Sequence, residues 1–352
     1  MKIGLLTGGG DSCGINAAIR AAAVKAAKDG HKAVGIRNGW AGAIEGWFFE
    51  LDPDVISPAI LGRGGTILGT SRTNPFKMDG AVEKMQKNVE EAGLEAIVAI
   101  GGDDTLGVAH RINGLPKPIP AVGVPQTIDN DISGTDYAIG FHTAVEVATE
   151  AADRLTTTAE SHSRIMVLEV MGRDAGHVAL AAASAGGADL VLVPEHPFTI
   201  EEVVEVVKER RAAGKTFSLI VVAEGAKPKG AEQITVSEKT DAFGHVRLGG
   251  VADFLANEIE AHTGFETRSM NLGHLQRGGT STPFDRILAT QLGYAAIELV
   301  ECGEFDRMVA VRGSKITSVP LEEAIGKTKP VDEELYRVVN DLYRYAGMRP
   351  AA

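Results

Sequence analysis

The chain has 352 residues, of which 44% are hydrophobic and 23% charged, and its formal net charge is -12. This composition is that of a globular protein with room for two domains, and the negative charge argues against a nucleic-acid partner, which would need a basic surface. No apolar run approaches the roughly 20 residues that span a membrane, and Cys13 and Cys302 form no metal-binding or disulfide pattern. A strand-like segment starts directly after Met1-Lys2, so we expect no signal peptide, no membrane partner and a cytoplasmic protein.

Short runs rich in β-branched residues alternate with helical patterns along most of the chain. In chain order the sequence predicts strand Ile3–Thr7, helix Asn16–Lys28, strand Ala33–Ile36, helix Gly80–Ala92, strands Ala96–Ile100 and Ala121–Val124, helix Thr143–Thr157, strands Ile165–Val170 and Leu190–Val193, helix Ile200–Ala213, strand Ser218–Ala223, helices Val251–His262 and Phe284–Cys302, and strand Met308–Val311. Helical spacing returns in Pro330–Tyr345. The alternation predicts an α/β protein with doubly wound, mostly parallel sheets.

The sequence contains two glycine-rich turns, and the first follows a predicted strand, at the sheet edge where ligands bind in such folds. The first, Gly8–Asn16, opens a helix, and the backbone amides at a helix N-terminus form a site for anions. The second, Gly64–Arg72, ends in a cation that would suit phosphate. An ordinary tight turn and a solvated surface arginine explain the same residues, and the sequence leaves both interpretations open.

Acidic residues follow the next two predicted strands, in Gly101–Thr105 and in Pro125–Asp131. Mg²⁺ prefers one or two carboxylates together with substrate phosphate oxygens, and a carboxylate beside an alcohol can remove its proton. Asp129 and Asp131 alternate along what we expect to be an extended segment, so their side chains and that of Thr127 would share a face. The alternatives are helix capping in the first segment and Asx turns in the second.

Basic residues beside glycines make up the remaining pattern: Arg164, Met171–His177, Arg268 and Gly273–Gly279. A surface ion pair explains any one of these cations. In an acidic protein, however, the whole group indicates a site for an anionic substrate. Together with the acidic segments, it predicts phosphoryl transfer to an alcohol.

In this order, Gly9-Gly10-Asp11, Gly101-Gly102-Asp103, Thr127–Asp131, Met171-Gly172-Arg173 and Gly273–Gly279 resemble the 6-phosphofructokinase family over nearly the whole chain. The resemblance implies two α/β domains with the active site in the cleft between them. We expect a larger, donor-binding domain from residues 1–140 plus about 275–325, and a smaller, sugar-phosphate-binding domain from residues 141–274 plus about 326–352. It also implies Mg²⁺, fructose 6-phosphate as acceptor, pyrophosphate or ATP as donor, and a homodimer or homotetramer.

The resemblance assigns roles to matching residues. Asp129 is the expected base for the sugar 1-hydroxyl, Thr127 orients that hydroxyl and Asp131 supports the base. Asp103 is the expected Mg²⁺ ligand, while Arg72 and Arg173 stabilise the transferring phosphoryl group. The expected donor-binding set is Gly10, Arg72, Asp103, Asp104, Thr105 and Gln126, and the expected sugar-phosphate set is Thr127, Asp129, Met171, Gly172, Arg173, Glu224, His274 and Arg277, with Arg164 and Arg268 reaching it from an adjacent subunit.

The donor is the open question. Members that use ATP typically have glycine at the position of Asp104, where a carboxylate would repel the α-phosphate, so pyrophosphate fits better. Members that use pyrophosphate commonly pair that aspartate with lysine, where this chain has Gln126. Trp40 lies near where ATP users stack adenine, although a tryptophan is more commonly part of a core.

We therefore expect a pyrophosphate-dependent phosphofructokinase. The alternatives are the ATP-dependent enzyme, the same chemistry on another sugar phosphate such as sedoheptulose 7-phosphate, and a weakly active homologue that binds sugar phosphate. An oxidoreductase is disfavoured, because the acidic residue expected about 20 residues after a dinucleotide-binding loop has no clear counterpart.

Overall fold

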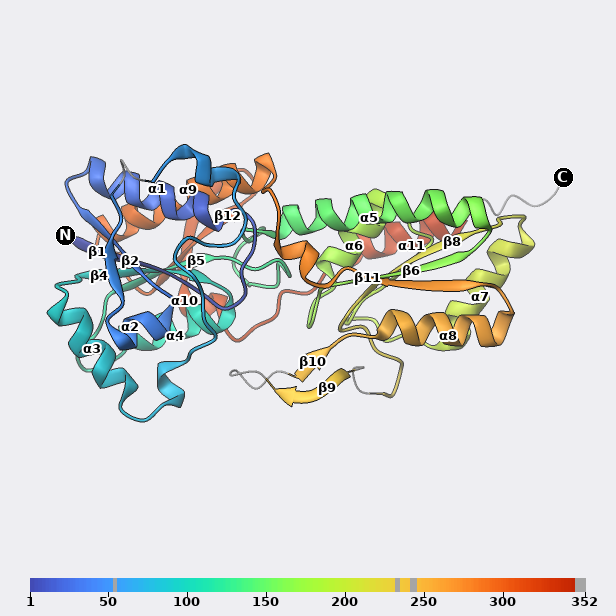
Figure 1. The fold of residues 1–352 in the computed structure, drawn as a ribbon, viewed down its shortest axis with the longest axis horizontal. Helices are drawn as coiled ribbons and strands as arrows, with labels where there is room; N and C mark the ends of the chain where they lie inside the picture. The colour runs from blue at the N-terminus through green and yellow to red at the C-terminus, as the bar shows by residue number, and fades with distance from the viewer. Residues whose placement is uncertain (53–55, 232–234, 241–245, 346–352) are drawn as a thin grey trace. The chain divides into compact units, whose positions relative to one another are not determined.

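The computed structural model describes residues 1–52, 56–231, 235–240 and 246–345. Residues 346–352 of the smaller predicted domain lie outside this range. The chain divides into two compact units (Figure 1). The first consists mainly of Met1–Thr143 and Arg277–Thr328, and the second mainly of Ala144–Lys239, Val246–Gln276 and the stretch from Lys329.

The first unit is built on a seven-stranded sheet with the strand order β13-β12-β5-β4-β1-β2-β3. Its central strands are parallel, whereas β3 and β13 are antiparallel edge strands. In this register Gly8 lies opposite Gly101, and Gly101 lies opposite Pro125, so three strands end side by side. The strands are β1 (Lys2–Gly8), β2 (Lys32–Ile36), β3 (Phe48–Glu50), β4 (Ala96–Gly101), β5 (Ala121–Pro125), β12 (Arg307–Arg312) and β13 (Lys315–Pro320).

Helices cover both faces of this sheet because alternate strand residues point to opposite sides. One apolar cluster joins the sheet to α1 (Ile15–Lys28) and α9 (Pro283–Glu301), and another joins it to α2 (Trp40–Glu45), α3 (Ala81–Glu91) and α4 (Asp103–Asn113). Alanine and glycine let α1 and α9 approach closely, since a Cβ at Gly293 would lie 2.3 Å from the carbonyl oxygen of Ala18. The short elements are η1 (Pro58–Gly62), η2 (Pro75–Lys77) and α10 (Leu321–Ala324).

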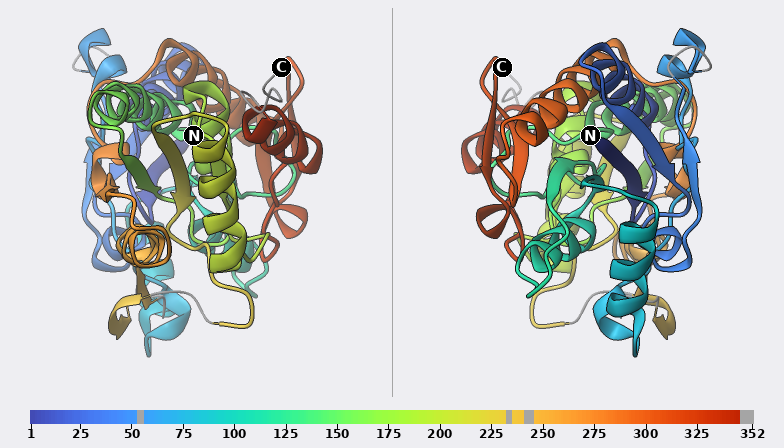
Figure 2. Two further views of the ribbon diagram at one scale, coloured as in Figure 1. Left: turned by 90° about the vertical axis from the view of Figure 1, so that its right-hand side faces the viewer. Right: turned by 90° about the vertical axis from the view of Figure 1, so that its left-hand side faces the viewer.

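The second unit contains a four-stranded parallel sheet with the order β11-β6-β8-β7. Its strands are β6 (Ile165–Val170), β7 (Leu190–Leu192), β8 (Ser218–Ala223) and β11 (Thr267–Asn271). Helices α7 (Ile200–Ala212) and α8 (Val251–Thr263) pack on one face through a shared apolar cluster, and Figure 2 shows this unit end-on in its left view. The other elements are α5 (Phe141–His162), which runs from the first unit into the second, α6 (His177–Gly186), η3 (Gly273–Arg277), α11 (Glu333–Tyr345), and β9 (Thr235–Thr240) paired with β10 (Val246–Leu248).

The α/β fold with mostly parallel sheets is confirmed, and each predicted strand and helix is present, with ends that differ by a few residues. The structure adds elements that the sequence did not predict, notably β3, β11, β13, α2, α4 and α6. Strand β11 was missed because it lies at the edge of its sheet, where polar and exposed residues replace the buried apolar run of a central strand. Within the described residues, no helix is both long and apolar enough to cross a membrane.

Candidate functional site

The two glycine turns of the first unit lie against each other. The backbone N–H of Gly9 donates to the carbonyl oxygen of Ser71 at 3.0 Å, and Oγ1 of Thr70 donates to the carbonyl oxygen of Gly9 at 2.8 Å. Gly9 has φ of +80°, a conformation that glycine adopts without strain. The structure therefore brings the exposed Arg72 next to the N-terminal turn, as a shared phosphate site would require.

The N-terminus of α4 lies beside the same turn. Its N-cap residue is Gly102, and no side chain caps the helix, so the capping interpretation of Asp103, Asp104 and Thr105 is wrong. Thr105 instead fills a notch between two strand ends: a Cβ on Gly8 would lie 2.6 Å from its Oγ1, and one on Gly101 2.6 Å from its Cβ. Because the Thr105 side chain is buried, any contact between Thr105 and a donor would come from its backbone amide.

Asp103 and Asp104 occupy the first turn of α4. Asp103 is exposed, and one of its oxygens, Oδ1, accepts from the backbone N–H of Gly326 at 2.6 Å. Among the described residues, no three histidine, cysteine or acidic side chains are grouped closely enough to hold a metal ion by themselves. A single exposed carboxylate, oriented by a backbone amide, fits Mg²⁺ that takes its other ligands from substrate phosphates and water.

The segment after β5 forms a turn, so the prediction that Thr127, Asp129 and Asp131 alternate along an extended segment is wrong. Oγ1 of Thr127 accepts from the backbone N–H of Asp129 at 3.2 Å. Asn130 has φ of +54°, and its side chain holds the backbone of Asp136 and Ala138. Asparagine tolerates this left-handed conformation, which explains the turn. The turn joins the Thr127 hydroxyl to the backbone of Asp129, and both residues are half-buried.

Gln126, one residue earlier, lies inside the first unit. Its side chain is 2% exposed, and Nε2 donates to Oγ of Ser12 at 3.0 Å. Trp40 is also buried, at 1% exposed, and belongs to the apolar core. Neither side chain is on the surface, so in this conformation neither contacts a donor that arrives from solvent.

Arg277 contacts the N-terminal glycine turn. Its Nη1 donates to the carbonyl oxygen of Asp11 at 2.9 Å, and a Cβ on Gly10 would lie 2.6 Å from the same nitrogen. Cys13, in that turn, donates from Sγ to the carbonyl oxygen of Gly278 at 3.2 Å. Burial, followed by the charges of Asp285 and Asp11, raises the pKa of Cys13 to about 11, so the thiol is a neutral donor near neutral pH.

In the second unit, the sugar-phosphate candidates gather at the carboxyl ends of β6 and β8. The backbone N–H of Glu224 donates to the carbonyl oxygen of Val170 at 2.8 Å, and that of Gly225 donates to Gly172 at 3.0 Å. Gly172 has φ of +141° and could not carry a Cβ, which would lie 2.7 Å from the carbonyl oxygen of Ala175. Glu224 is thereby held next to the loop that contains Met171, Gly172 and Arg173.

A residue that the sequence analysis did not select ties η3 to this loop. Gln276 is fully buried; its Oε1 accepts from the backbone N–H of Met171 at 3.2 Å, and its Nε2 donates to the carbonyl oxygen of Gly273 at 3.0 Å. The exposed His274 therefore lies in a turn anchored to Met171. The signal for Gln276 was its place inside the Gly273–Gly279 motif.

Arg164 and Arg268 lie elsewhere in the second unit. Both guanidinium groups bind the carboxylate of Glu266, at 2.9 Å and 2.6 Å respectively, and Arg164 is the main cause of the lowered pKa of Glu266. Arg164 precedes β6 and Met171 follows it, and at 3.3 Å per residue their Cα atoms are about 23 Å apart. Within one chain, these arginines do not join the other sugar-phosphate candidates.

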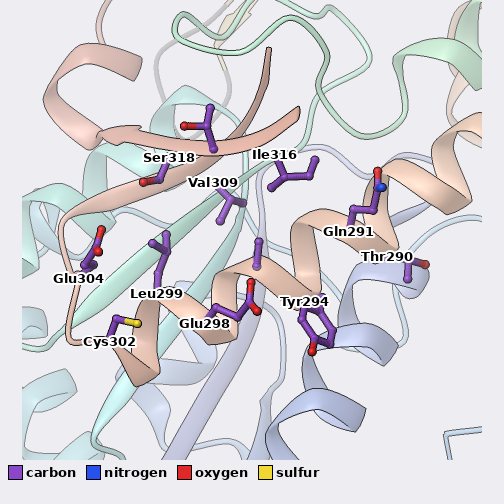
Figure 3. A pocket seen from close by; sticks show the side chains of 12 residues that line it. Thr290, Gln291, Tyr294, Glu298, Leu299, Cys302, Glu304, Val309, Ile316 and Ser318 are labelled. Atoms are coloured by element: carbon purple, nitrogen blue, oxygen red, sulfur yellow. The ribbon is translucent and has the colours of Figure 1, made fainter. Parts of the chain in front are cut away.

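A separate pocket of about 550 Å³ lies between α9 and β13 (Figure 3). Leu299, Val309 and Ile316 form its apolar part, and Glu298 and Glu304 contribute carboxylates. None of the predicted site residues lines it, and its lining contains no arginine or lysine. It therefore lacks the cations with which a protein binds phosphate.

Comparisons with known proteins show which family the chain belongs to. A family model described as Phosphofructokinase matches residues 2–300. The chain is 53% identical over 337 residues to the pyrophosphate–fructose 6-phosphate 1-phosphotransferase of Amycolatopsis methanolica, covering 96% of this chain and 98% of the relative. It is 49% identical over 339 residues to the ATP-dependent 6-phosphofructokinase 3 of Streptomyces coelicolor, with 96% and 98% covered.

Solved structures of phosphofructokinases have the same fold as this chain. The structure of Pichia pastoris phosphofructokinase in the T-state superimposes with a TM-score of 0.83 at 30% identity, over 98% of this chain and 39% of that one. The pyrophosphate-dependent phosphofructokinase of Marinobacter aquaeolei shares the fold, with a TM-score of 0.81 at 24% identity over 100% of this chain and 92% of that one. The chain is an enzyme of the phosphofructokinase family.

Proposed function

We propose that this enzyme transfers a phosphoryl group from pyrophosphate to the 1-hydroxyl of fructose 6-phosphate. The observation that carries the choice of donor is Asp104, half-buried in the first turn of α4 beside the N-terminal glycine turn. A carboxylate there would repel and displace the α-phosphate of a nucleotide but leaves room for a donor that ends at its second phosphate. The relative of Amycolatopsis methanolica, named for the pyrophosphate reaction, supports the same donor.

In the proposed mechanism, the Asp129 carboxylate removes the proton of the sugar 1-hydroxyl while Thr127 orients that hydroxyl. The sugar oxygen forms a bond to the terminal phosphorus of pyrophosphate, the bridging P–O bond breaks, and inorganic phosphate leaves. Arg72 and Arg173 stabilise the charge on the transferring group, and Asp131 supports the base. Mg²⁺, held by Asp103 and phosphate oxygens, would neutralise charge on the donor.

The acceptor is proposed to bind in the second unit. Met171, Gly172, Glu224 and His274 are held together there by backbone hydrogen bonds and by Gln276. Arg277, whose Nη1 donates to the carbonyl oxygen of Asp11, is proposed to supply a cation for the sugar phosphate.

We further propose a homo-oligomer in which Arg164 and Arg268 serve the sugar-phosphate site of an adjacent subunit. Both lie about 17 to 23 Å along the sheet from Met171, beyond the reach of a side chain in the same chain. Glu266 holds the two guanidinium groups together, which prepares them for one phosphate. Strand β11, which carries Arg268, is the edge of its sheet.

A second candidate is the ATP-dependent reaction. It is favoured by Gln126, which supplies no charge at the position where pyrophosphate users commonly have lysine, and by the ATP-dependent relative of Streptomyces coelicolor. The buried Trp40 does not add to this case, because it is not available to stack on adenine.

A donor and acceptor panel tests the proposal. Pyrophosphate, ATP and ADP are each offered with fructose 6-phosphate, and pyrophosphate is also offered with sedoheptulose 7-phosphate, with and without Mg²⁺. We expect Mg²⁺-dependent formation of fructose 1,6-bisphosphate with pyrophosphate. Turnover with ATP but not with pyrophosphate would refute the proposal that pyrophosphate is the donor. If no donor supports turnover, the protein is better explained as a homologue that binds sugar phosphate. The Asp104→Gly variant tests the role of Asp104 directly. Without the carboxylate there is room for the α-phosphate, so this variant should gain activity with ATP.

A further inference from the structure

Gln126 and Ser12 form a buried polar pair at the end of β5. Ser12 is fully buried and Gln126 is 2% exposed, and Nε2 of Gln126 donates to Oγ of Ser12 at 3.0 Å. Gln126 directly precedes the Thr127–Asp129 turn, while Ser12 belongs to the N-terminal glycine turn. The pair thus joins the turn proposed to hold the base to the turn proposed to hold the donor.

Ser12 also holds a third segment. Its Oγ lies 3.3 Å from the carbonyl oxygen of Ile139, to which it donates, and a Cβ on Gly140 would lie 2.3 Å from Ser12. Ile139 in turn forms an isolated β-bridge with Gln126, and its backbone N–H donates to the carbonyl oxygen of Pro125 at 3.0 Å. Three segments that are distant in sequence therefore meet at one hydroxyl group, and the position of Gln126 is fixed from both sides.

The amide of Gln126 is not fully satisfied. Its Oε1 is buried and, within the described residues, accepts no hydrogen bond. A buried acceptor without a donor is unfavourable, so a nonpolar side chain of the same length would serve the stability of this core equally well. The amide is therefore better explained by its hydrogen bond to Ser12 than by a contribution to folding.

We propose that Gln126 and Ser12 are positioning residues: Gln126 acts on the reaction by fixing the Thr127–Asp129 turn against the N-terminal glycine turn, and its side chain does not contact the donor. This inference rests on the proposed function and deepens it, because it assigns discrimination between donors to Asp104 alone. Where other family members pair such an aspartate with a lysine, this chain would have the buried Gln126, which positions the Thr127–Asp129 turn.

Three variants test the pair: Gln126→Met, which keeps the length and removes the amide, Ser12→Ala, and the double variant. If the pair positions the turn, each single variant lowers kcat by about 10- to 100-fold, as small displacements of reacting groups do. The KM for pyrophosphate stays within about threefold of the wild type, because no donor contact has been removed. The double variant should match Ser12→Ala, since the hydrogen bond that Gln126→Met removes is already lost when the Ser12 hydroxyl is absent.

Asn113→Ala is the matched control. The Asn113 amide holds Ala121 at the opposite end of the same strand, β5, through hydrogen bonds of 3.0 Å and 3.1 Å. This variant should lower the melting temperature and leave kcat and KM unchanged. The proposal is overturned if Gln126→Met raises the KM for the donor about tenfold at constant kcat while Ser12→Ala is silent, or if the effects of the two substitutions add.

Hydrogen exchange gives a readout that does not depend on turnover. Ser12→Ala should speed exchange in the peptide that contains Thr127 to Asn130, and Gln126→Met should speed exchange in the peptide that contains Gly9 to Asn16. If neither peptide changes, the pair does not hold the two turns and the inference fails, whichever donor the wild-type enzyme uses. If the wild type turns over ATP and not pyrophosphate, the proposed donor fails, and the same kinetic comparison with ATP still decides the role of the pair.

Discussion

Arg268 is predicted to act on the active site of a neighbouring subunit, and subunit mixing tests this. In the paired strands, Arg268 lies opposite Met166, and Met171 is five residues further along β6. At 3.3 Å per residue this separation is about 17 Å, which is longer than an arginine side chain. Arg268 therefore cannot bind the same sugar phosphate as the Met171 loop of its own chain.

The experiment combines two damaged subunits in one oligomer. Arg268→Ala should reduce kcat/KM for fructose 6-phosphate by about 10- to 100-fold, the effect of losing a charged hydrogen bond. Asp129→Ala should reduce kcat by about 10²- to 10⁴-fold, the effect of losing a general base. In a mixed dimer, the Arg268→Ala subunit keeps its own Asp129 and receives Arg268 from its partner, so one of the two sites is intact.

Random 1:1 mixing makes half of the dimers mixed, and the expected activity is therefore about one quarter of the wild type. Differently tagged subunits are coexpressed, the mixed species is isolated by purification on both tags, and its turnover is measured in the coupled assay. The purified mixed dimer should reach about half of the wild-type activity. If it is no more active than the mean of its parents, Arg268 does not serve a neighbouring site, and the argument from strand length is refuted.

Four further predictions concern individual residues. Asp129→Asn should lower kcat by about 10²- to 10⁴-fold with little change in the KM for fructose 6-phosphate; an unchanged kcat in steady-state assays would remove Asp129 from the role of base. Glu266→Gln should raise the KM for fructose 6-phosphate severalfold at constant kcat, because the carboxylate no longer holds Arg164 and Arg268, and an unchanged KM would contradict this. Iodoacetamide at pH 8 should modify the exposed Cys302 and spare the buried Cys13, as mass spectrometry would show. Because burial raises the pKa of Cys13 from 9.0 to about 11, its contribution to stability is full below pH 9 and is lost as the pH rises towards 11. The melting-temperature difference between wild type and Cys13→Ala should shrink over that range, and a constant difference would contradict the shift.

The sequence was informative where one local rule decides the structure. Buried parallel strands are continuous apolar runs, so β4 and β6 were predicted with nearly correct ends. The glycine turns were found because glycine there permits a backbone conformation or a close approach that other residues cannot adopt. Both signals depend only on neighbouring residues, and together they predict where the strands end and where the turns after them begin.

The sequence failed where contacts with distant residues decide. The Thr127–Asp131 segment reads as extended, but Asn130 adopts a left-handed conformation that is supported by its bonds to Asp136 and Ala138. The position of Gln126 in a motif did not reveal that its side chain bonds to Ser12 in the interior. Neither contact has a signature within a few residues of its own position.

The side chain of Thr105 determines which residues are tolerated at Gly8 and Gly101. The Thr105 side chain occupies the space that a methyl group on either glycine would need, with separations of 2.6 Å. A protein-engineering library that varies Gly8 or Gly101 alone will therefore recover almost only glycine at these positions. An alanine at Gly8 becomes acceptable only once position 105 is smaller, and such a change also alters the start of α4, so remodelling of the donor site has to treat the three codons together.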